Sequence, residues 1–252
     1  MSKLIIQVYE IQDPREAEAM VALGVDHVGS VVLSEAEWKV PSVKETVDVV
    51  RNTPAKSSII PLFNTPDAVY RLLDYYLPHI VHFCEMLPPG EEGRAERERL
   101  VALQQGVRER FPGVAVMRSV PIPAAGSANA FPVLAVAREF EPVSDFFLTD
   151  TLITNPAGAA HGDQPVAGFV GITGITCDWG AAAELVRGSR VPVILAGGLS
   201  PENVAAGMRQ VRPAGVDTCT ATNAVDSTGR PVRFRKDPEK VRRFVEEVRR
   251  AG

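Results

Sequence analysis

The stretch 191-VPVILAGGLSPENVAAG-207 predicts a buried strand, a glycine turn and the start of a helix. Val191 to Leu195 have no polar face, as expected of a strand covered on both sides. Gly197 and Gly198 end the strand, and Ser200-Pro201 offers an N-cap followed by a proline suited to the first helical turn. A buried strand that leads directly into a helix is typical of a parallel α/β sheet.

The same unit recurs along the chain. Strand-like runs occupy residues 4–10, 27–33, 58–63, 79–83, 114–119, 145–150, 192–196 and 215–220. Two predicted helix starts are capping boxes, Asp13-Pro14 with Glu16 and Ser42 with Glu45. The other predicted helix starts are Thr65-Pro66, Asp178, Ser200-Pro201 and Asp237-Pro238. Weaker helical patterns cover residues 91–110 and 129–140, and Gly24 suits the C-terminal end of the first helix.

Eight strands alternating with about eight helices require parallel strands joined by right-handed crossovers. Eight such units in about 250 residues match a (β/α)8 barrel. We therefore predict an α/β chain whose residues 1–252 form a single-domain (β/α)8 TIM barrel, with a long βα loop, 151–177, after the sixth strand. The alternative, an open doubly wound sheet, lacks the expected G-x-G-x-x-G after the first strand.

Composition argues against several classes of function. The chain has 252 residues, 45% of them hydrophobic, and its 27 basic and 31 acidic side chains give a net charge of −4. This balance offers no general attraction to nucleic acid or to an anionic membrane. Three cysteines and four histidines show no zinc or disulfide spacing, and no run is long enough to span a bilayer. We expect a cytoplasmic protein without metal or cofactor; a homo-oligomer is compatible with the sequence.

Two turns near the end of the predicted barrel suggest a phosphate site. Gly197-Gly198 follows the seventh strand and Thr220-Ala221 the eighth, the positions where such barrels often bind phosphate. A residue without Cβ lets backbone N–H groups approach an anion. The alternative is that the glycines only form a tight turn.

Several segments in the same order resemble the phosphoribosylanthranilate isomerase family of tryptophan biosynthesis. They are 11-IQDPREAEAMVALGVDHVG-29, 148-LTDT-151, 171-GITGITCDW-179, 192-PVILAGGLSPENV-204 and 215-GVD-217. The resemblance implies a (β/α)8 barrel that converts an N-linked phosphoribosylamine to an aminoketose. It also implies that Asp150, at the position of the family's strand-six aspartate, is the general acid, a role that suits a carboxyl group of raised pKa.

The family's general base does not carry over. Its Lys-x-Cys-Gly motif at the end of the first strand falls on Gln7, Tyr9 and Glu10. A phenol, with a pKa near ~10, is a poor base at neutral pH. Tyr9 could instead donate a hydrogen bond or serve as an acid, while Glu10, His82 or Cys84 acts as the base.

Two binding positions also differ from the family. Trp38 lies near the place of the arginine that binds the anthranilate carboxylate, and the adjacent Lys39 could replace it without the bidentate geometry of arginine. The family's Ser-Ser-Gly phosphate turn becomes Cys219-Thr220-Ala221. Gly171, Gly174, Gly197 and Gly198 remain, so a phosphate site is still expected.

The long loop 151–177 is expected on the catalytic face, where it could act as a lid. His161 and Asp163 within it could enter a closed site, although a solvated loop is the simpler interpretation. The cationic segment 230–250 is interpreted as an exposed final helix.

The sequence thus predicts an intramolecular isomerase of the aldose–ketose type, acting on a phosphorylated sugar or sugar-amine and diverged from the parent substrate. The catalytic candidates are Asp150 and Tyr9, and Gln7, Lys39, His82 and Cys84 are candidate substrate contacts. Two alternatives stay open: a phosphosugar lyase or aldolase, and a non-catalytic barrel that binds a phosphorylated metabolite.

Overall fold

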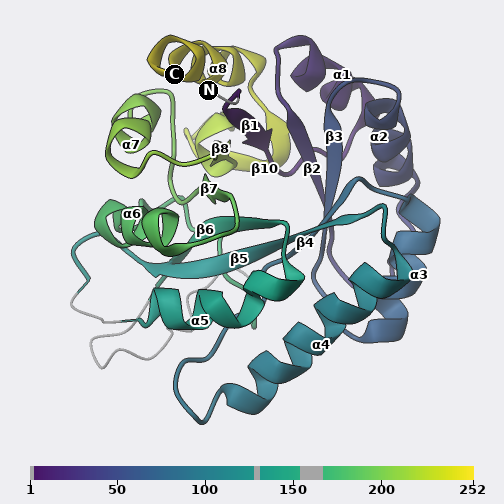
Figure 1. The fold of residues 1–252 in the computed structure, drawn as a ribbon. Helices are drawn as coiled ribbons and strands as arrows, with labels where there is room; N and C mark the ends of the chain where they lie inside the picture. Colours follow the sequence, from purple (N-terminus) through teal and green to yellow (C-terminus); the bar gives the residue numbers. More distant parts are fainter. Residues whose placement is uncertain (1–2, 128–130, 154–166) are drawn as a thin grey trace.

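The computed structural model describes residues 3–127, 131–153 and 167–252. Eight parallel strands close into a barrel in chain order, with helices around the outside (Figure 1). The barrel strands are β1 (Ile5–Val8), β2 (His27–Val32), β3 (Lys56–Pro61), β4 (Ile80–Phe83), β5 (Ala115–Pro123), β6 (Phe146–Leu152), β7 (Val193–Leu195) and β8 (Gly215–Thr218). The predicted barrel architecture is confirmed.

The helices alternate with the strands as predicted. They are α1 (Pro14–Ala22), α2 (Pro41–Arg51), α3 (Pro66–Tyr76), α4 (Arg94–Arg110), α5 (Val133–Phe140), α6 (Trp179–Gly188), α7 (Val204–Val211) and α8 (Pro238–Ala251). Two short 3-10 helices, η1 (Glu141–Val143) and η2 (Thr220–Thr222), follow α5 and β8. The apolar faces of the helices pack on the outward-facing strand residues, and this layer forms the largest hydrophobic core.

Aspartate caps were predicted correctly. The side chains of Asp13, Asp178 and Asp237 accept backbone N–H bonds at the starts of α1, α6 and α8. Gly24, just after α1, has φ +91°, the left-handed conformation expected there. Such caps depend only on neighbours in sequence, so a local pattern is sufficient to find them.

Other predicted starts were wrong. No capping box forms at Ser42, because α2 begins one residue earlier at Pro41 with Val40 at the N-cap. Glu16 completes no box either, since its carboxylate accepts the backbone N–H of Lys236 at 2.6 Å. Residues 200–203 form a turn, held by the bond from Ser200 N to Asn203 Oδ1, and α7 begins only at Val204.

The cationic segment 230–250, interpreted as an exposed final helix, contains a strand before that helix, which begins at Pro238 after the predicted start at Asp237. β10 (Pro231–Lys236) pairs antiparallel with β9 (Asn223–Val225), outside the barrel sheet. Within β10, the exposed and less exposed residues alternate. This is the period-two pattern of a strand, which the clustered charges conceal in the sequence.

The barrel interior is layered. Apolar side chains that include Ile80, Met117, Leu148 and Ile194 fill one inner layer. A second apolar cluster, formed by Tyr9, Val31, Ile60 and Cys84 with partly buried neighbours, packs separately. Polar side chains from β1, β3, β4, β5, β6 and β8 form hydrogen bonds inside the barrel, and the candidate site is built from them.

Candidate active site

Two adjoining pockets lie at the carboxyl ends of the barrel strands, the face that carries catalysis in this fold. The first, of about 570 Å³, is mainly apolar, and the second, of about 370 Å³, is lined by turns. Asp150, Ile172, Asp217 and Cys219 line both. The apolar pocket is further lined by Tyr9, Glu10, Val31, Ile60, Leu62, His82, Cys84, Leu148, Phe169, Val170 and Gly171.

The second pocket contains most of the residues predicted to bind phosphate. Gly174, Gly197, Gly198, Thr220 and Ala221 all line it. Gly197 and Gly198 have φ +92° and +61°, and a Cβ on Gly198 would lie 2.6 Å from the Thr176 backbone nitrogen. Only glycine fits this conformation and this close approach without strain. The glycine-rich turns thus bring backbone groups to the pocket wall.

Asp150 extends from β6 to the boundary between the pockets. The Ser119 hydroxyl donates a hydrogen bond to its Oδ2 at 2.6 Å. Desolvation by the surrounding protein raises the pKa of Asp150 to about 7, although the Ser119 bond opposes the rise. Gly171 lines the apolar pocket and covers this carboxyl, since a Cβ there would lie 2.6 Å from Asp150 Oδ1. Asp150 can therefore exchange a proton near neutral pH.

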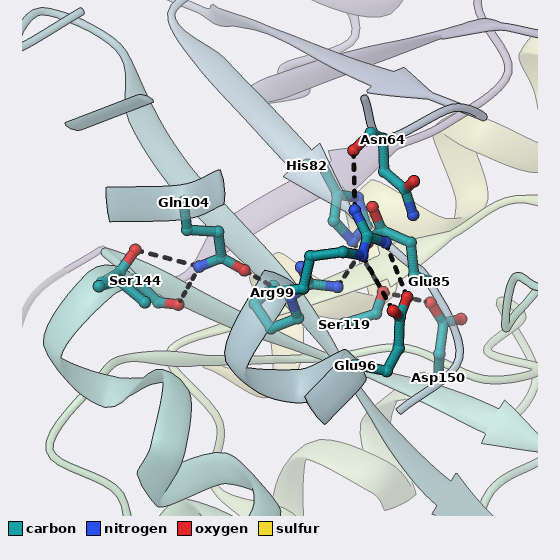
Figure 2. A network of polar contacts seen from close by, with 11 residues as sticks. Asn64, His82, Glu85, Glu96, Arg99, Gln104, Ser119, Ser144 and Asp150 are labelled. Atoms are coloured by element: carbon teal, nitrogen blue, oxygen red, sulfur yellow. Dashed lines mark hydrogen bonds and ion pairs between the residues drawn. The ribbon is translucent and has the colours of Figure 1, made fainter. Parts of the chain in front are cut away.

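A chain of hydrogen bonds leads from Asp150 across the barrel. His82 Nε2 lies 2.8 Å from Ser119 Oγ, and His82 Nδ1 lies 2.7 Å from the Tyr9 hydroxyl. The Tyr9 hydroxyl is 2.7 Å from Ser58 Oγ. Figure 2 shows His82 and Ser119 beside Asp150. Burial, together with the positive charge of Arg118, lowers the pKa of His82 to about 3, so its ring is neutral.

This chain tolerates both protonation states of Asp150. When the carboxyl is ionised, Ser119 donates to it, His82 donates to Ser119 and Tyr9 donates to His82. When it is protonated, every bond can reverse, because hydroxyls and a neutral imidazole each donate and accept. No buried polar atom of the chain loses its partner in either state.

Tyr9 suits this chain of hydrogen bonds because its phenol is buried and stays protonated. Its side chain is only 5% exposed, and burial raises the pKa of its phenol well above 10. Gly29 on β2 makes room for it, since a Cβ there would lie 2.1 Å from the Tyr9 ring. A phenol that stays protonated and is bonded to Ser58 and His82 is suited to hydrogen bonding, not to removing a proton from carbon.

Glu10, Cys84 and His82, the other candidates for the general base, are also poorly suited to remove a proton from a substrate. Glu10 has φ +66°, the conformation that suits the glycine of the family motif, and its carboxylate forms an ion pair with Arg233 at 2.6 Å. Cys84 lines the apolar pocket, but burial raises the pKa of its thiol well above the usual value. His82 is engaged at both ring nitrogens.

Two predicted substrate contacts lie away from the pockets. Lys39 Nζ lies 5.0 Å from the Trp38 ring centre and 5.5 Å from that of Tyr75, and it lines a separate surface groove. Gln7 lines neither pocket; its amide lies beneath them, between Asp217 and His27.

Asp217 is a site residue that was not predicted from the sequence. This residue lies on β8, is 6% exposed and lines both pockets. Its Oδ1 accepts a bond from Gln7 Nε2 at 3.1 Å, and desolvation raises its pKa to about 7. The available signal was its position, since an acidic residue near the carboxyl end of a barrel strand is a candidate for catalysis.

Part of the long loop lies against the apolar pocket. Phe169, Val170 and Ile172 line it, and an isolated bridge joins Phe169 to Glu85. Residues 154–166 of the loop, which include His161 and Asp163, lie outside the described residues, so the lid role of loop 151–177 stays a prediction.

Comparison with known proteins identifies the family. The family model for N-(5'-phosphoribosyl)anthranilate (PRA) isomerase matches residues 119–247. The PRA isomerase of Methanocella arvoryzae is 31% identical over 204 residues, which cover 76% of this chain and 83% of that protein. The chain belongs to the PRA isomerase family. The relative from Methanosarcina acetivorans, also named as a PRA isomerase, is 27% identical and covers 98% of this chain and 94% of its own length.

The fold of the PRA isomerase family is also found by structural comparison. The crystal structure of the Thermotoga maritima PRA isomerase matches with a TM-score of 0.68 and 19% identity, covering 98% of this chain and 99% of that one. Membership confirms the predicted enzyme class, an intramolecular isomerase of the aldose–ketose type. Within the described ranges, no cluster of three or more His, Cys, Asp or Glu side chains could hold a metal ion. No helix among the described residues is long and apolar enough to cross a membrane.

Proposed function

We propose that this protein isomerises a 5'-phosphoribosylamine to the corresponding aminoketose, with Asp150 as the general acid. The observation that carries the proposal is the position of Asp150 at the boundary of the two pockets. A phosphate in the glycine-lined pocket and an apolar amine substituent in the other would place the sugar ring between them, beside the carboxyl. The protonated Asp150 gives its proton to the ring oxygen as the C1–O bond breaks, and the nitrogen lone pair forms the C1 iminium.

We further propose that the substrate has diverged from phosphoribosylanthranilate. None of the described residues that line the apolar pocket is Lys or Arg. Lys39 stacks on aromatic rings elsewhere, and the positive charge of Arg233 is neutralised by Glu10. A carboxylate in this apolar pocket would be desolvated without a cation to pair with, which is unfavourable. The pocket therefore favours an amine substituent that is apolar and uncharged.

The two alternatives are less well supported. An aldolase of the Schiff-base type needs a lysine in the cleft, and the described lining of neither pocket contains one. A barrel that only bound a phosphorylated metabolite would gain nothing from two acidic side chains beside its phosphate pocket, where they weaken anion binding. Both carboxyls are understandable if they transfer protons.

The test compares two substrates and two variants. Purified protein is assayed with N-(5'-phosphoribosyl)anthranilate and with N-(5'-phosphoribosyl)aniline, which lacks the carboxylate. We expect turnover, with a higher kcat/KM for the aniline compound. Asp150→Asn should lower kcat by roughly 10²–10⁴-fold, the usual contribution of a general acid. Asp74→Asn, an exposed change on α3, is the matched control.

The outcomes are distinct. Failure of the soluble protein to convert either compound, and failure to complement a tryptophan auxotroph lacking the isomerase, would refute the proposed function. A preference for the anthranilate compound would refute only the divergence of substrate. Full activity of Asp150→Asn would refute the role of Asp150.

A further inference from the structure

We propose that Asp217 is the general base of this enzyme, in place of the cysteine that the family has at Tyr9, and that Gln7 is the residue that positions it. This inference rests on the proposed isomerase function and names the group that completes it. Asp217 lines both pockets together with Asp150, so a sugar lying between them contacts both carboxyls. Neither Tyr9 nor Glu10 offers a free basic atom there.

The strand register brings Asp217 and Gln7 together. Gln7 on β1 pairs in register with Asp217 on β8 and with His27 on β2. Gln7 Nε2 donates to Asp217 Oδ1 at 3.1 Å, and Gln7 Oε1 lies 3.1 Å from His27 Nδ1. Burial, then the nearby Lys56, lowers the pKa of His27 to about 4. The imidazole is therefore neutral, and in the tautomer that carries its proton on Nδ1 it donates to Gln7 Oε1 and holds the NH2 group toward the carboxylate.

One oxygen of Asp217 is held and the other is available. Within the described residues, Asp217 Oδ2 receives no hydrogen bond, and it is not one of the polar atoms that are both unpaired and closed off from solvent. It is therefore open to the cleft. A carboxylate anchored by one oxygen and open at the other is arranged to accept a proton from a ligand.

The charges around the two carboxyls assign their roles. Asp217 has the Gln7 amide and the buried cation Lys236 to favour its ionised form, and Asp150 opposes them. For Asp150, the group that favours the ionised form is the Ser119 hydroxyl, which carries no charge. Both pKa values are raised to about 7, and like charges seldom ionise together in one site. A pair that shares one proton near neutral pH would keep it mainly on Asp150, leaving Asp217 as the base.

With these roles, the two carboxyls complete the isomerisation without a net gain or loss of protons. After Asp150 has protonated the ring oxygen, Asp217 removes the proton from C2 of the iminium. The C–H electron pair forms the C1=C2 bond, and the C=N π pair returns to nitrogen, giving an enol-amine. Asp217 returns its proton to C1 as the enol O–H gives its proton to Asp150. The product is the aminoketose, and both carboxyls regain their starting states.

Gln7 makes a sharp test because the family motif has lysine there. An ammonium group beside Asp217 would favour its charged form and lower its pKa, by about 1–3 units for a close pair. A base works only when ionised, so activity is lost as the pH falls through that pKa. Gln7→Lys should therefore move the acidic limb of the kcat/KM profile down by about one pH unit or more, and leave the alkaline limb, which reports Asp150, in place.

The experiment measures pH profiles with N-(5'-phosphoribosyl)aniline and N-(5'-phosphoribosyl)anthranilate, and inhibition by inorganic phosphate. Asp217→Asn should lower kcat by roughly 100-fold or more, while inorganic phosphate should inhibit as strongly as in the wild type or more strongly, because a negative charge beside the phosphate pocket is removed. Asp217→Glu should recover part of the loss of kcat. Asp74→Asn is again the control. Full activity of Asp217→Asn, or an unmoved acidic limb in Gln7→Lys, overturns this inference while an active wild type leaves the proposed function intact. A wild type inactive on both compounds overturns the two together.

Discussion

Removing the Ser119 hydroxyl should change how the activity depends on pH. This hydroxyl donates to Asp150 Oδ2 at 2.6 Å and stabilises the ionised carboxylate. A hydrogen bond to a charged group contributes about 1.5–3 kcal/mol, and one pKa unit corresponds to about 1.4 kcal/mol. Because Asp150 is partly exposed to the cleft, we take the lower end, which raises its pKa by about one unit, from about 7 to about 8.

The sign of the effect follows from the role of Asp150. A general acid must be protonated, so kcat/KM falls as the pH rises through the pKa of Asp150. Ser119→Ala should move this alkaline limb to higher pH. At pH 8 the wild type would keep about a tenth of its maximal kcat/KM and the variant about half of its own maximum.

The assay is a kcat/KM profile for both proteins between about pH 5 and 10, a range chosen to bracket the pKa near 7. Ser144→Ala is the matched control, since this buried hydroxyl accepts a bond from Gln104 on the outer side of the barrel (Figure 2). Its loss should change stability without moving the limb. An alkaline limb that stays in place in Ser119→Ala, or moves to lower pH, would refute the assignment of Asp150 as the acid held by this bond.

Two further predictions concern stability. The Arg118 guanidinium is fully buried and lies 2.6 Å from Glu85, so Glu85→Gln leaves it without a counter-ion. This change should lower the free energy of unfolding by about 3–5 kcal/mol and the Tm by on the order of 10 °C. Glu98→Gln, in an exposed ion pair, should lower it by under about 1 kcal/mol. Equal melting temperatures of the two variants would contradict this. Gly29→Ala should destabilise by about 1–3 kcal/mol, because its Cβ would overlap the Tyr9 ring. In a Tyr9→Cys background, which lacks the ring, the same Gly29→Ala change should cost much less. A Gly29→Ala protein as stable as the wild type would show that the ring moves aside without cost.

Local sequence patterns were sufficient to predict the barrel fold. Strand runs that lack a polar face, followed by Asp or proline helix starts, predicted eight βα units, and the structure contains them. The same patterns failed at 231–236, where the arginines and lysine that suggested a helix lie on a strand paired with β9. Pairing between strands depends on a partner elsewhere in the chain, which a local pattern does not contain.

The sequence also located part of the candidate site. Asp150 and the glycines after β7 lie where the order of the units predicted, because parallel barrel strands bring their carboxyl ends to one face. Lys39 was expected to contact substrate, and the structure instead places its ammonium group on the rings of Trp38 and Tyr75. The side chain of a residue next to a substrate-binding position in sequence can point to a different side of the loop.

The sequence by itself thus determined the barrel, its catalytic face and one carboxyl group, since each follows from periodicity and chain order. Only the tertiary structure decided which side chains meet inside the barrel. Gln7 and Asp217 are separated by 210 positions, and Tyr9 and His82 by 73, yet both pairs are hydrogen-bonded. Closing the barrel pairs the first strand with the last, and the register of that closure places an amide beside one carboxylate and a phenol in a chain that ends at the other.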